Sequence, residues 1–374
     1  MRILVIADDI TGAAEMAGVA RRMGCRVRFT TSPDRLDGSE EVAVLATDTR
    51  SMRREQALDT TRTIVARLSE LPKGVILFKK TDSALRGHLV AELQELMLLG
   101  YGRALLLAAN PSKGRCIEGG IYTINGTPIA ETPFRTDPEF PATTSEAIAL
   151  VGGGVTYATD PQRSLEAGIS IGESRTVSDV EAWVAALEHD VLLAGAADAF
   201  QALLRREGYR ETPQPPFVGL GTKRTLITLG STVRHDLTQA PFFARNRVAH
   251  CPMPDAVFAG GATQPWIEAC RKALPHYPSL LLRIPQQVEV DGGRALHLRR
   301  TMAQTAVAVV KEMKPEEWVI EGGASAYAML EAIGWFDFTV ADEVAAGVVR
   351  LYHAESDTYV TFKPGSYPWG PLFE

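Results

Sequence analysis

The sequence of 374 residues has little of several things that mark specialised classes of protein. Its four cysteines form no Cys-x-x-Cys pair, which argues against a zinc site and predicts reduced thiols in a cytoplasmic protein. No apolar run approaches the roughly 20 residues that span a bilayer, and we expect no signal peptide, because strand-like sequence starts at residue 2. The net charge of -6 comes without a basic block, so neither nucleic acid nor a membrane is expected as a partner.

Several cofactor signatures are absent as well. There is no Gly-x-x-x-x-Gly-Lys-Ser/Thr motif, which argues against a P-loop NTPase. No Gly-x-Gly-x-x-Gly follows a predicted strand, which argues against an NAD-binding fingerprint. The seven histidines show no spacing typical of metal ligands. Function has to be sought in other motifs.

What the sequence does contain is a regular alternation of short apolar runs and amphipathic stretches. This alternation predicts βαβ units and a parallel sheet, whose strands all end at the same edge. Asn125-Gly126, between two alternating segments, predicts a β-hairpin within this pattern. Three prolines in residues 211–219 indicate a linker, so we expect domains at 1–212 and 217–374. The predicted fold class is α/β, with two domains, each a mostly parallel sheet flanked by helices. The strands expected in the first part span 2–7, 25–31, 41–50, 74–82 and 103–111.

The first predicted strand ends in two adjacent aspartates, Asp8 and Asp9, before a Thr-Gly turn and a helix-like stretch. Two carboxylates would repel a bare phosphate, whereas they can accept hydrogen bonds from hydroxyls, remove a proton or hold a metal. We therefore expect this strand end to bind a polyhydroxylated substrate rather than a nucleotide phosphate. The competing interpretation is that one aspartate only caps the following helix.

Charged residues also follow two other predicted strands and occupy one loop. Residues 78–88 carry lysines, an aspartate, a serine and an arginine, and an arginine fork with a lysine suits a substrate carboxylate. Residues 47–51 have the same character, and the Pro/Gly-rich loop 109–120 carries further cations. The competing interpretation for each is a solvated surface with weak ion pairs. The predicted substrate-binding residues are Asp48, Arg50, Lys80, Asp82, Ser83, Arg86 and Arg115.

Three glycine-containing turns in the second half together predict a nucleotide-phosphate site. Residues 229–232 and 320–325 each follow a strand and are expected to open a helix, where backbone N–H groups can meet phosphate oxygens. Residues 363–366 add a lysine and a glycine turn after the last long strand. The predicted nucleotide-binding residues are Ser231, Gly322, Gly323, Ala324, Ser325 and Gly365.

Five stretches resemble motifs of the four-carbon acid sugar kinases, a family long described as a domain of unknown function. Asp8-Asp9-Ile10-Thr11-Gly12 resembles the opening Asp-Asp-x-Thr-Gly of that family. Lys80-Thr81-Asp82-Ser83-Ala84-Leu85-Arg86-Gly87 resembles its Lys-x-Asp-Ser-Thr-x-Arg-Gly, with Ala84 in place of Thr. Residues 110–115, with 124–126 and 131–132, are similar to its Gly-Arg loop and hairpin. Gly230-Ser231, Gly322-Gly323 and Lys363-x-Gly365 are similar to the turns of its nucleotide domain.

The resemblance implies a sugar-acid-binding first domain and a nucleotide-binding second domain. The family phosphorylates tetronates such as threonate and erythronate, or their keto forms, at the terminal hydroxyl with ATP, and phosphoryl transfer implies Mg²⁺ on the ATP oxygens. It further implies that Asp8 or Asp9 is the catalytic residue that orients the hydroxyl, and that Lys80 and Arg86 hold the carboxylate. The expected ligand is therefore a small sugar acid, and a homodimer is compatible with this assignment.

The chain departs from the family pattern at two places. Ala324 stands where an acidic residue usually follows the Gly-Gly pair. Pro364, which has no N–H to donate, stands in the last turn. The alternative function is therefore a regulatory module that binds a sugar acid with weakened or lost use of ATP.

Overall fold

The structure is a computed structural model of the chain, and it falls into two compact units, Met1–Thr212 and Pro213–Glu374. The division lies within the proline-rich segment 211–219. The described residues are 1–36, 38–70, 74–137, 140–231, 237, 239–285, 292–365 and 367–374.

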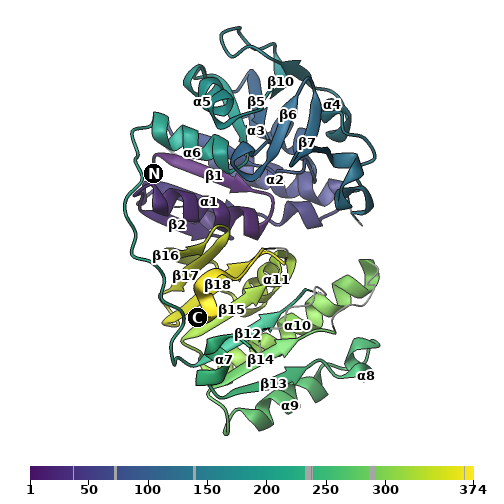
Figure 1. Cartoon of the computed structure of the whole chain (residues 1–374), viewed down its shortest axis with the longest axis vertical. Helices are drawn as coiled ribbons and strands as arrows, with labels where there is room; N and C mark the ends of the chain where they lie inside the picture. The colour runs from purple at the N-terminus through teal and green to yellow at the C-terminus, as the bar shows by residue number, and fades with distance from the viewer. Residues whose placement is uncertain are drawn as a thin grey trace. The chain divides into compact units, whose positions relative to one another are not determined.

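The first unit is built on a parallel sheet with the strand order β2-β3-β1-β4-β11-β5-β10-β9 (Figure 1). Every neighbouring pair in this order is parallel. All five residues of β1 are buried, as expected for a strand covered by helices on both faces. The strands are β1 (Ile3–Ala7), β2 (Val27–Thr30), β3 (Val42–Ala46), β4 (Ile76–Lys80), β5 (Arg103–Leu107), β9 (Thr156–Ala158), β10 (Gly168–Gly172) and β11 (Val191–Gly195).

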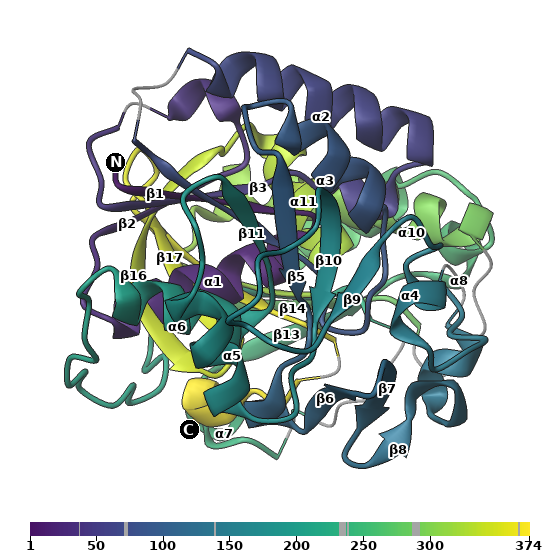
Figure 2. The same cartoon turned by 90° about the horizontal axis from the view of Figure 1, so that it is seen from above.

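Helices cover both faces of this sheet (Figure 2). On one face α2 and α3 pack against each other and join a core that includes Leu4, Ile6 and Leu93. On the other face α1 and α5 both contact α6. The predicted α/β class is confirmed for this unit. Its helices are α1 (Ile10–Arg22), α2 (Arg54–Leu68), α3 (Leu89–Met97), α4 (Ala147–Leu150), α5 (Val177–Ala185) and α6 (Ala197–Arg206).

A small antiparallel sheet interrupts the α/β pattern where the sequence predicts a hairpin. It consists of β6 (Arg115–Glu118), β7 (Ile121–Ile124) and β8 (Thr127–Pro128). Asn125 and Gly126 connect β7 to β8 with φ of 51° and 79°, the left-handed pair that a tight two-residue hairpin turn requires.

One sequence pattern in this unit has no catalytic meaning. Residues 168–172 spell Gly-x-Ser-x-Gly, which in hydrolases forms a strained turn that exposes the serine. Here the pattern lies along β10, and the buried Ser170 hydroxyl lies 2.8 Å from the Thr156 hydroxyl of β9. A serine within a strand is not a nucleophile elbow.

The second unit contains a mixed sheet with the order β13-β14-β12-β15-β18-β17-β16. The pairs from β13 to β18 are parallel, whereas β18, β17 and β16 are joined antiparallel. Its strands are β12 (Thr225–Leu229), β13 (Val248–Pro252), β14 (Ser279–Arg283), β15 (Glu317–Glu321), β16 (Asp337–Ala345), β17 (Val348–His353) and β18 (Thr358–Lys363). Its helices are α7 (Pro241–Arg245), α8 (Asp255–Phe258), α9 (Gln264–Ala273), α10 (Gly292–Met313) and α11 (Gly323–Ile333). Across the described residues of both units, no helix combines the length and apolar character that crossing a bilayer would require.

Strand β4 places two adjacent lysines on opposite faces of the first sheet, because side chains alternate along a strand. Lys79 lies in register with Ile6 and forms an ion pair with Glu92 of α3, and both side chains are 1% exposed. Lys80 lies in register with Ala7, and its ammonium lies 3.8 Å from Glu15 of α1. Lys79 therefore belongs to the core, and Lys80 lies on the opposite face of the sheet, beside α1.

We expect Lys79→Met to lower the free energy of unfolding by about 3–5 kcal/mol, because it leaves the Glu92 carboxylate buried without a counter-charge. The double variant Lys79→Met/Glu92→Leu removes both charges and should recover most of that loss. Urea unfolding followed by circular dichroism measures both changes. Equal destabilisation of the single and double variants would show that the unpaired Glu92 carboxylate is not the cause of the loss.

Candidate active site

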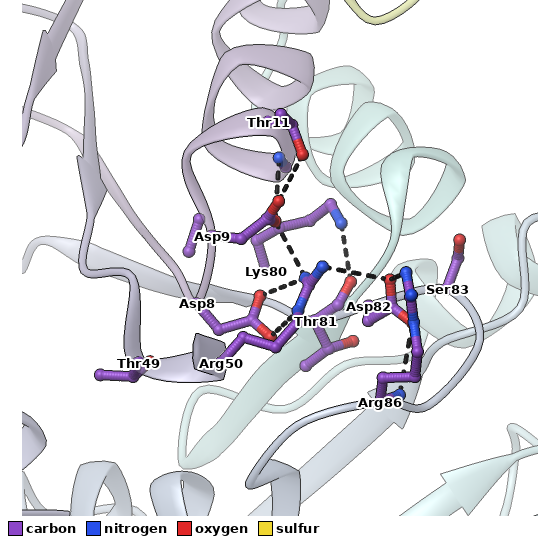
Figure 3. Close-up of polar contacts among 12 residues, drawn as sticks. Asp8, Asp9, Thr11, Thr49, Arg50, Lys80, Thr81, Asp82, Ser83 and Arg86 are labelled. Atoms are coloured by element: carbon purple, nitrogen blue, oxygen red, sulfur yellow. Dashed lines mark hydrogen bonds and ion pairs between the residues drawn. The ribbon is translucent and has the colours of Figure 1, made fainter. Parts of the chain in front are cut away.

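The polar edge of the first unit forms where β3, β1 and β4 end side by side (Figure 3). Asp8 and Asp9 follow β1, Arg50 follows β3, and Lys80 and Asp82 lie at the end of β4. Because these three parallel strands are neighbours, residues that are up to 74 positions apart meet in one cluster.

Arg50 is at the centre of this cluster and contacts three carboxylates. Its Nε and Nη2 donate to the two oxygens of Asp8, both at 2.8 Å, and Nη2 also donates to Asp9 Oδ1 at 2.9 Å. Its Nη1 lies 3.4 Å from Asp82 Oδ1. Burial opposes the charge of the guanidinium, but the three carboxylates outweigh it and raise the pKa of Arg50 well above its usual value. Arg50 is thus a permanent cation that links all three strand ends.

Asp9 caps helix α1, so the helix-cap interpretation holds for this residue. Its Oδ1 accepts a hydrogen bond of 3.0 Å from the backbone N–H of Gly12, and Oδ2 accepts one from the Thr11 hydroxyl. Burial by itself would raise the pKa of Asp9, but Arg50, Lys80 and the Thr11 hydroxyl together lower it. The carboxylate therefore remains ionised and well suited to accept hydrogen bonds.

The glycines of the two N-terminal motifs are explained by their closeness to these carboxylates. A Cβ at position 12 would lie 2.5 Å from Asp9 Oδ1, so a larger residue would require the Asp9 carboxylate to shift. Gly87 has a φ of +102°, and a Cβ there would lie 3.1 Å from Asp8 Oδ2. A Cβ at either position would crowd an aspartate of the cluster, and position 87 favours glycine for its backbone conformation as well.

Arg86 is committed to two carboxylates in this structure. Its Nε and Nη2 donate to Asp82 Oδ2 and Oδ1 at 2.8 and 3.0 Å, and its Nη1 donates to Asp137 at 3.0 Å. Burial would raise the pKa of Asp82, but Arg50 and Arg86 outweigh this and hold it far below its usual value. Arg86 thus sets the position of Asp82 as well as contributing positive charge to the edge.

Arg115 and Ser83 lie beside this network. The Arg115 guanidinium donates to the Ser83 hydroxyl and packs on the ring of Phe134, with 5.7 Å between Cζ and the ring centroid. The buried Tyr122 hydroxyl donates to the Ser83 carbonyl. Arg115 has no carboxylate partner among the described residues, which distinguishes it from Arg50 and Arg86.

Two acidic residues of this region were missed by the sequence reasoning. Glu15 of α1 accepts from Lys113 at 2.5 Å and lies close to Lys80, and these cations hold its pKa below the usual value although burial would raise it. Glu15 could have been found in the sequence, because it is a single acidic residue within an Ala-rich apolar helix. Asp137, the second partner of Arg86, stands in a loop and gave no signal of its own.

Asp48, the remaining predicted residue, lies at the same edge but in an unusual backbone conformation. It is 8% exposed and has a φ of 54° and a ψ of 18°, in the left-handed region. Its backbone carbonyl accepts from the Ser51 N–H at 3.2 Å, and the Arg50 N–H donates to the Asp8 carbonyl at 3.1 Å. The left-handed residue therefore helps to turn the chain so that Arg50 reaches the end of β1.

The second unit contains a pocket of about 350 Å³ whose lining includes all six predicted nucleotide-binding positions. Gly322 has a φ of +96° and precedes α11, so the turn between β15 and this helix requires glycine. The prediction that 320–325 opens a helix is confirmed, whereas residues 232–236, where the other helix was expected, lie outside the described residues. The described residues of the lining are Gly230, Ser231, Ile284, Ala295, Leu298, Arg299, Met302, Gly322, Gly323, Ala324, Ser325 and Gly365.

The turns that line this pocket are tied together by Glu321 and Lys363. Glu321 ends β15, Lys363 ends β18, and their fully buried side chains pair at 2.7 Å. The N–H of Gly230 donates to the Glu321 carbonyl at 3.1 Å, and the N–H of Gly322 donates to the Lys363 carbonyl at 2.9 Å. Three glycine turns are therefore held side by side by backbone and ionic contacts.

The low pKa of Asp82 predicts a specific acid response. A carboxylate with a lowered folded-state pKa stabilises the protein above its unfolded pKa, about 3.9, and this contribution is lost as the pH falls toward the folded-state value. We therefore expect the stability gap between parent and Asp82→Asn to narrow as the pH falls from about 5 to 3, by up to about 1.4 kcal/mol per pH unit. Urea unfolding at each pH measures the gap.

Asp59→Asn is the matched control for this experiment, because the Asp59 side chain is 76% exposed. The difference in free energy of unfolding between Asp59→Asn and the parent should stay nearly constant over the same pH range. A pH-independent gap for Asp82→Asn would contradict the ionic role assigned to Asp82.

Comparisons with known proteins agree with this arrangement. A family model described as a sugar-binding N-terminal domain matches residues 3–199. The chain is 24% identical to a D-threonate kinase of Bordetella bronchiseptica and 26% identical to one of Cupriavidus necator, over 92% and 93% of this chain and 88% and 89% of those proteins. A D-threonate kinase of Salmonella typhimurium is 30% identical over a shorter stretch, 40% of this chain and 36% of that protein.

A solved structure has the same fold over nearly the whole chain. Protein HI1011 of Haemophilus influenzae, from the DUF1537 family, aligns with a TM-score of 0.74 over 99% of this chain and 98% of that one. At 16% identity this likeness bears on the fold alone. The family model covers more than half of the chain, and the relatives aligned over nearly its full length carry the kinase names that the motifs predicted. The chain therefore belongs to the four-carbon acid sugar kinase family, formerly the DUF1537 family, and its first unit contains the sugar-binding N-terminal domain.

Proposed function

We propose that this chain is an ATP-dependent kinase that phosphorylates a four-carbon sugar acid at its terminal hydroxyl. The observation that carries the proposal is the pocket of the second unit, which is lined by three glycine-containing turns and the start of α11. Such a lining offers backbone N–H groups and a positive helix end to phosphate oxygens. The names of related proteins, D-threonate, D-erythronate and 3-oxo-tetronate kinase, supply the class of acid.

The polar edge of the first unit would bind the sugar acid. The carboxylates of Asp8 and Asp9 would accept hydrogen bonds from substrate hydroxyls, and Arg50 holds both in place. A general base works best when its pKa lies near the working pH, and the pKa of Asp9 is lowered. Asp9 is therefore better suited to orient the substrate hydroxyl, and to stabilise positive charge that develops on its oxygen, than to remove its proton. For the acid group, Arg115 is the better-placed cation than Arg86, because Arg86 already pairs with Asp82 and Asp137.

Phosphoryl transfer itself requires positioning and charge neutralisation more than covalent chemistry. Mg²⁺, when bound with ATP, would neutralise charge on the phosphate oxygens. The oxygen donors that the pocket lining offers to such an ion are the hydroxyls of Ser231 and Ser325. Among the residues that the structure describes, no group of three or more His, Cys, Asp or Glu side chains is arranged to hold an ion by itself.

The direct test is release of ADP from Mg·ATP in the presence of D-threonate, D-erythronate and 3-oxo-tetronate, with Asp9→Asn beside the parent. An amide oxygen can still accept the Gly12 N–H, so this variant should keep the helix cap while losing the charge. We expect turnover by the parent with one of these acids, and a decrease in kcat of about 10²-fold in the variant with an unchanged Kd for ATP, because the hydroxyl is no longer oriented for attack.

Two outcomes would contradict the proposal in different ways. Full activity of Asp9→Asn would reduce Asp9 to a helix cap. Binding of an acid without any ATP-dependent turnover would favour the alternative function, a regulatory module. The departures from the family pattern at Ala324 and Pro364 are the basis of that alternative.

The pocket assignment is tested separately at Gly323. Valine at this first position of α11 would place a branched side chain among the turns that line the pocket. We expect Gly323→Val to weaken ATP binding by at least tenfold and to leave acid binding unchanged, with each ligand titrated by calorimetry. Equal ATP affinity in variant and parent would exclude this turn from the nucleotide site.

A further inference from the structure

The pocket of the second unit has one charged side chain among its described lining residues, Arg299. It comes from α10, where positions 295, 298, 299 and 302 all line the pocket. These positions are spaced i, i+3, i+4 and i+7, so a single face of the helix forms this part of the wall. The neighbouring Arg300 is exposed and does not belong to the lining.

The other cation close to the turns is not available to a ligand. Lys363 is completely buried, pairs with Glu321, and donates to the carbonyls of Pro364 and Gly365 at 2.9 and 3.1 Å. It is also absent from the described lining. Arg299, in contrast, is partly exposed, and no carboxylate pairs with it among the residues that the structure describes. Within the described part of the lining, Arg299 is therefore the side chain that can offer a full positive charge to the pocket.

We propose that Arg299 binds the phosphate chain of the nucleotide and makes the pocket selective for nucleoside di- and triphosphates over uncharged nucleosides. This inference rests on the proposed function. The sequence has no P-loop lysine for this purpose, and the glycine turns supply only the partial charges of N–H groups. A guanidinium fork can donate to two phosphate oxygens at once. The apolar lining residues Ile284, Leu298 and Met302 then remain for the uncharged part of the nucleotide.

The experiment compares Arg299→Gln and Arg299→Lys with the parent and with the matched control Arg300→Gln. Calorimetry measures the Kd for ATP, ADP and adenosine at low and high salt. Loss of a charge-assisted hydrogen bond predicts that Arg299→Gln raises the Kd for ATP by about 10- to 150-fold, and Arg299→Lys by less. The Kd for adenosine should change by no more than about twofold, and the ATP affinity of Arg299→Gln should depend less on salt than that of the parent.

The remaining outcomes overturn the inference. Equal losses for ATP and adenosine would mean that Arg299 only packs in the wall, and an unchanged Kd for ATP would mean that it does not meet the phosphates. The same loss in Arg300→Gln would point to a general charge effect of the helix. If the parent binds ATP normally in these cases, the proposed function stands and only the role of Arg299 fails. A parent that binds no nucleotide overturns both.

Discussion

The polar edge of the first unit depends on one interaction, the contact of the Arg50 guanidinium with Asp8, Asp9 and Asp82. Three carboxylates this close would repel one another and would be costly to bury without a counter-charge. A lysine could not replace the arginine, because a compact ammonium lacks the planar fork that meets both oxygens of Asp8. The lowered pKa values of Asp9 and Asp82 depend on this contact, which also fixes the position of Asp8.

The sequence predicted the fold class and the strand ends well, because both depend on local patterns. Buried parallel strands are continuous apolar runs, and the residues that follow them share an edge. The partners of Arg86 could not be predicted, since a long side chain can reach several carboxylates and only packing decides between Asp82 and Asp137. The position of Arg299 in the pocket lining could not be predicted for a related reason. Its helix contributes to the pocket through residues spaced i, i+3 and i+4, and no glycine turn or strand end in the sequence marks that face.

The departure of the last turn from the family pattern has a structural explanation. Pro364 cannot donate a hydrogen bond through its backbone nitrogen, but its carbonyl accepts from the Lys363 ammonium at 2.9 Å and from the Tyr367 N–H at 3.1 Å. The ring of Trp369 lies 4.6 Å from the same ammonium and packs on Phe373. The proline and tryptophan of this segment thus enclose Lys363 instead of lining the pocket.

The two lysines of β4 also limit how this segment can change over evolution. Strand side chains alternate with a period of two, so inserting or deleting one residue before Lys79 would exchange the faces of the two ammonium groups. An insertion would then remove the counter-charge of Glu92 in the core, and a deletion would remove the cation near Glu15 at the polar edge. We expect β4 to accept conservative substitutions but to preserve its length, whereas the loops around it can vary in length.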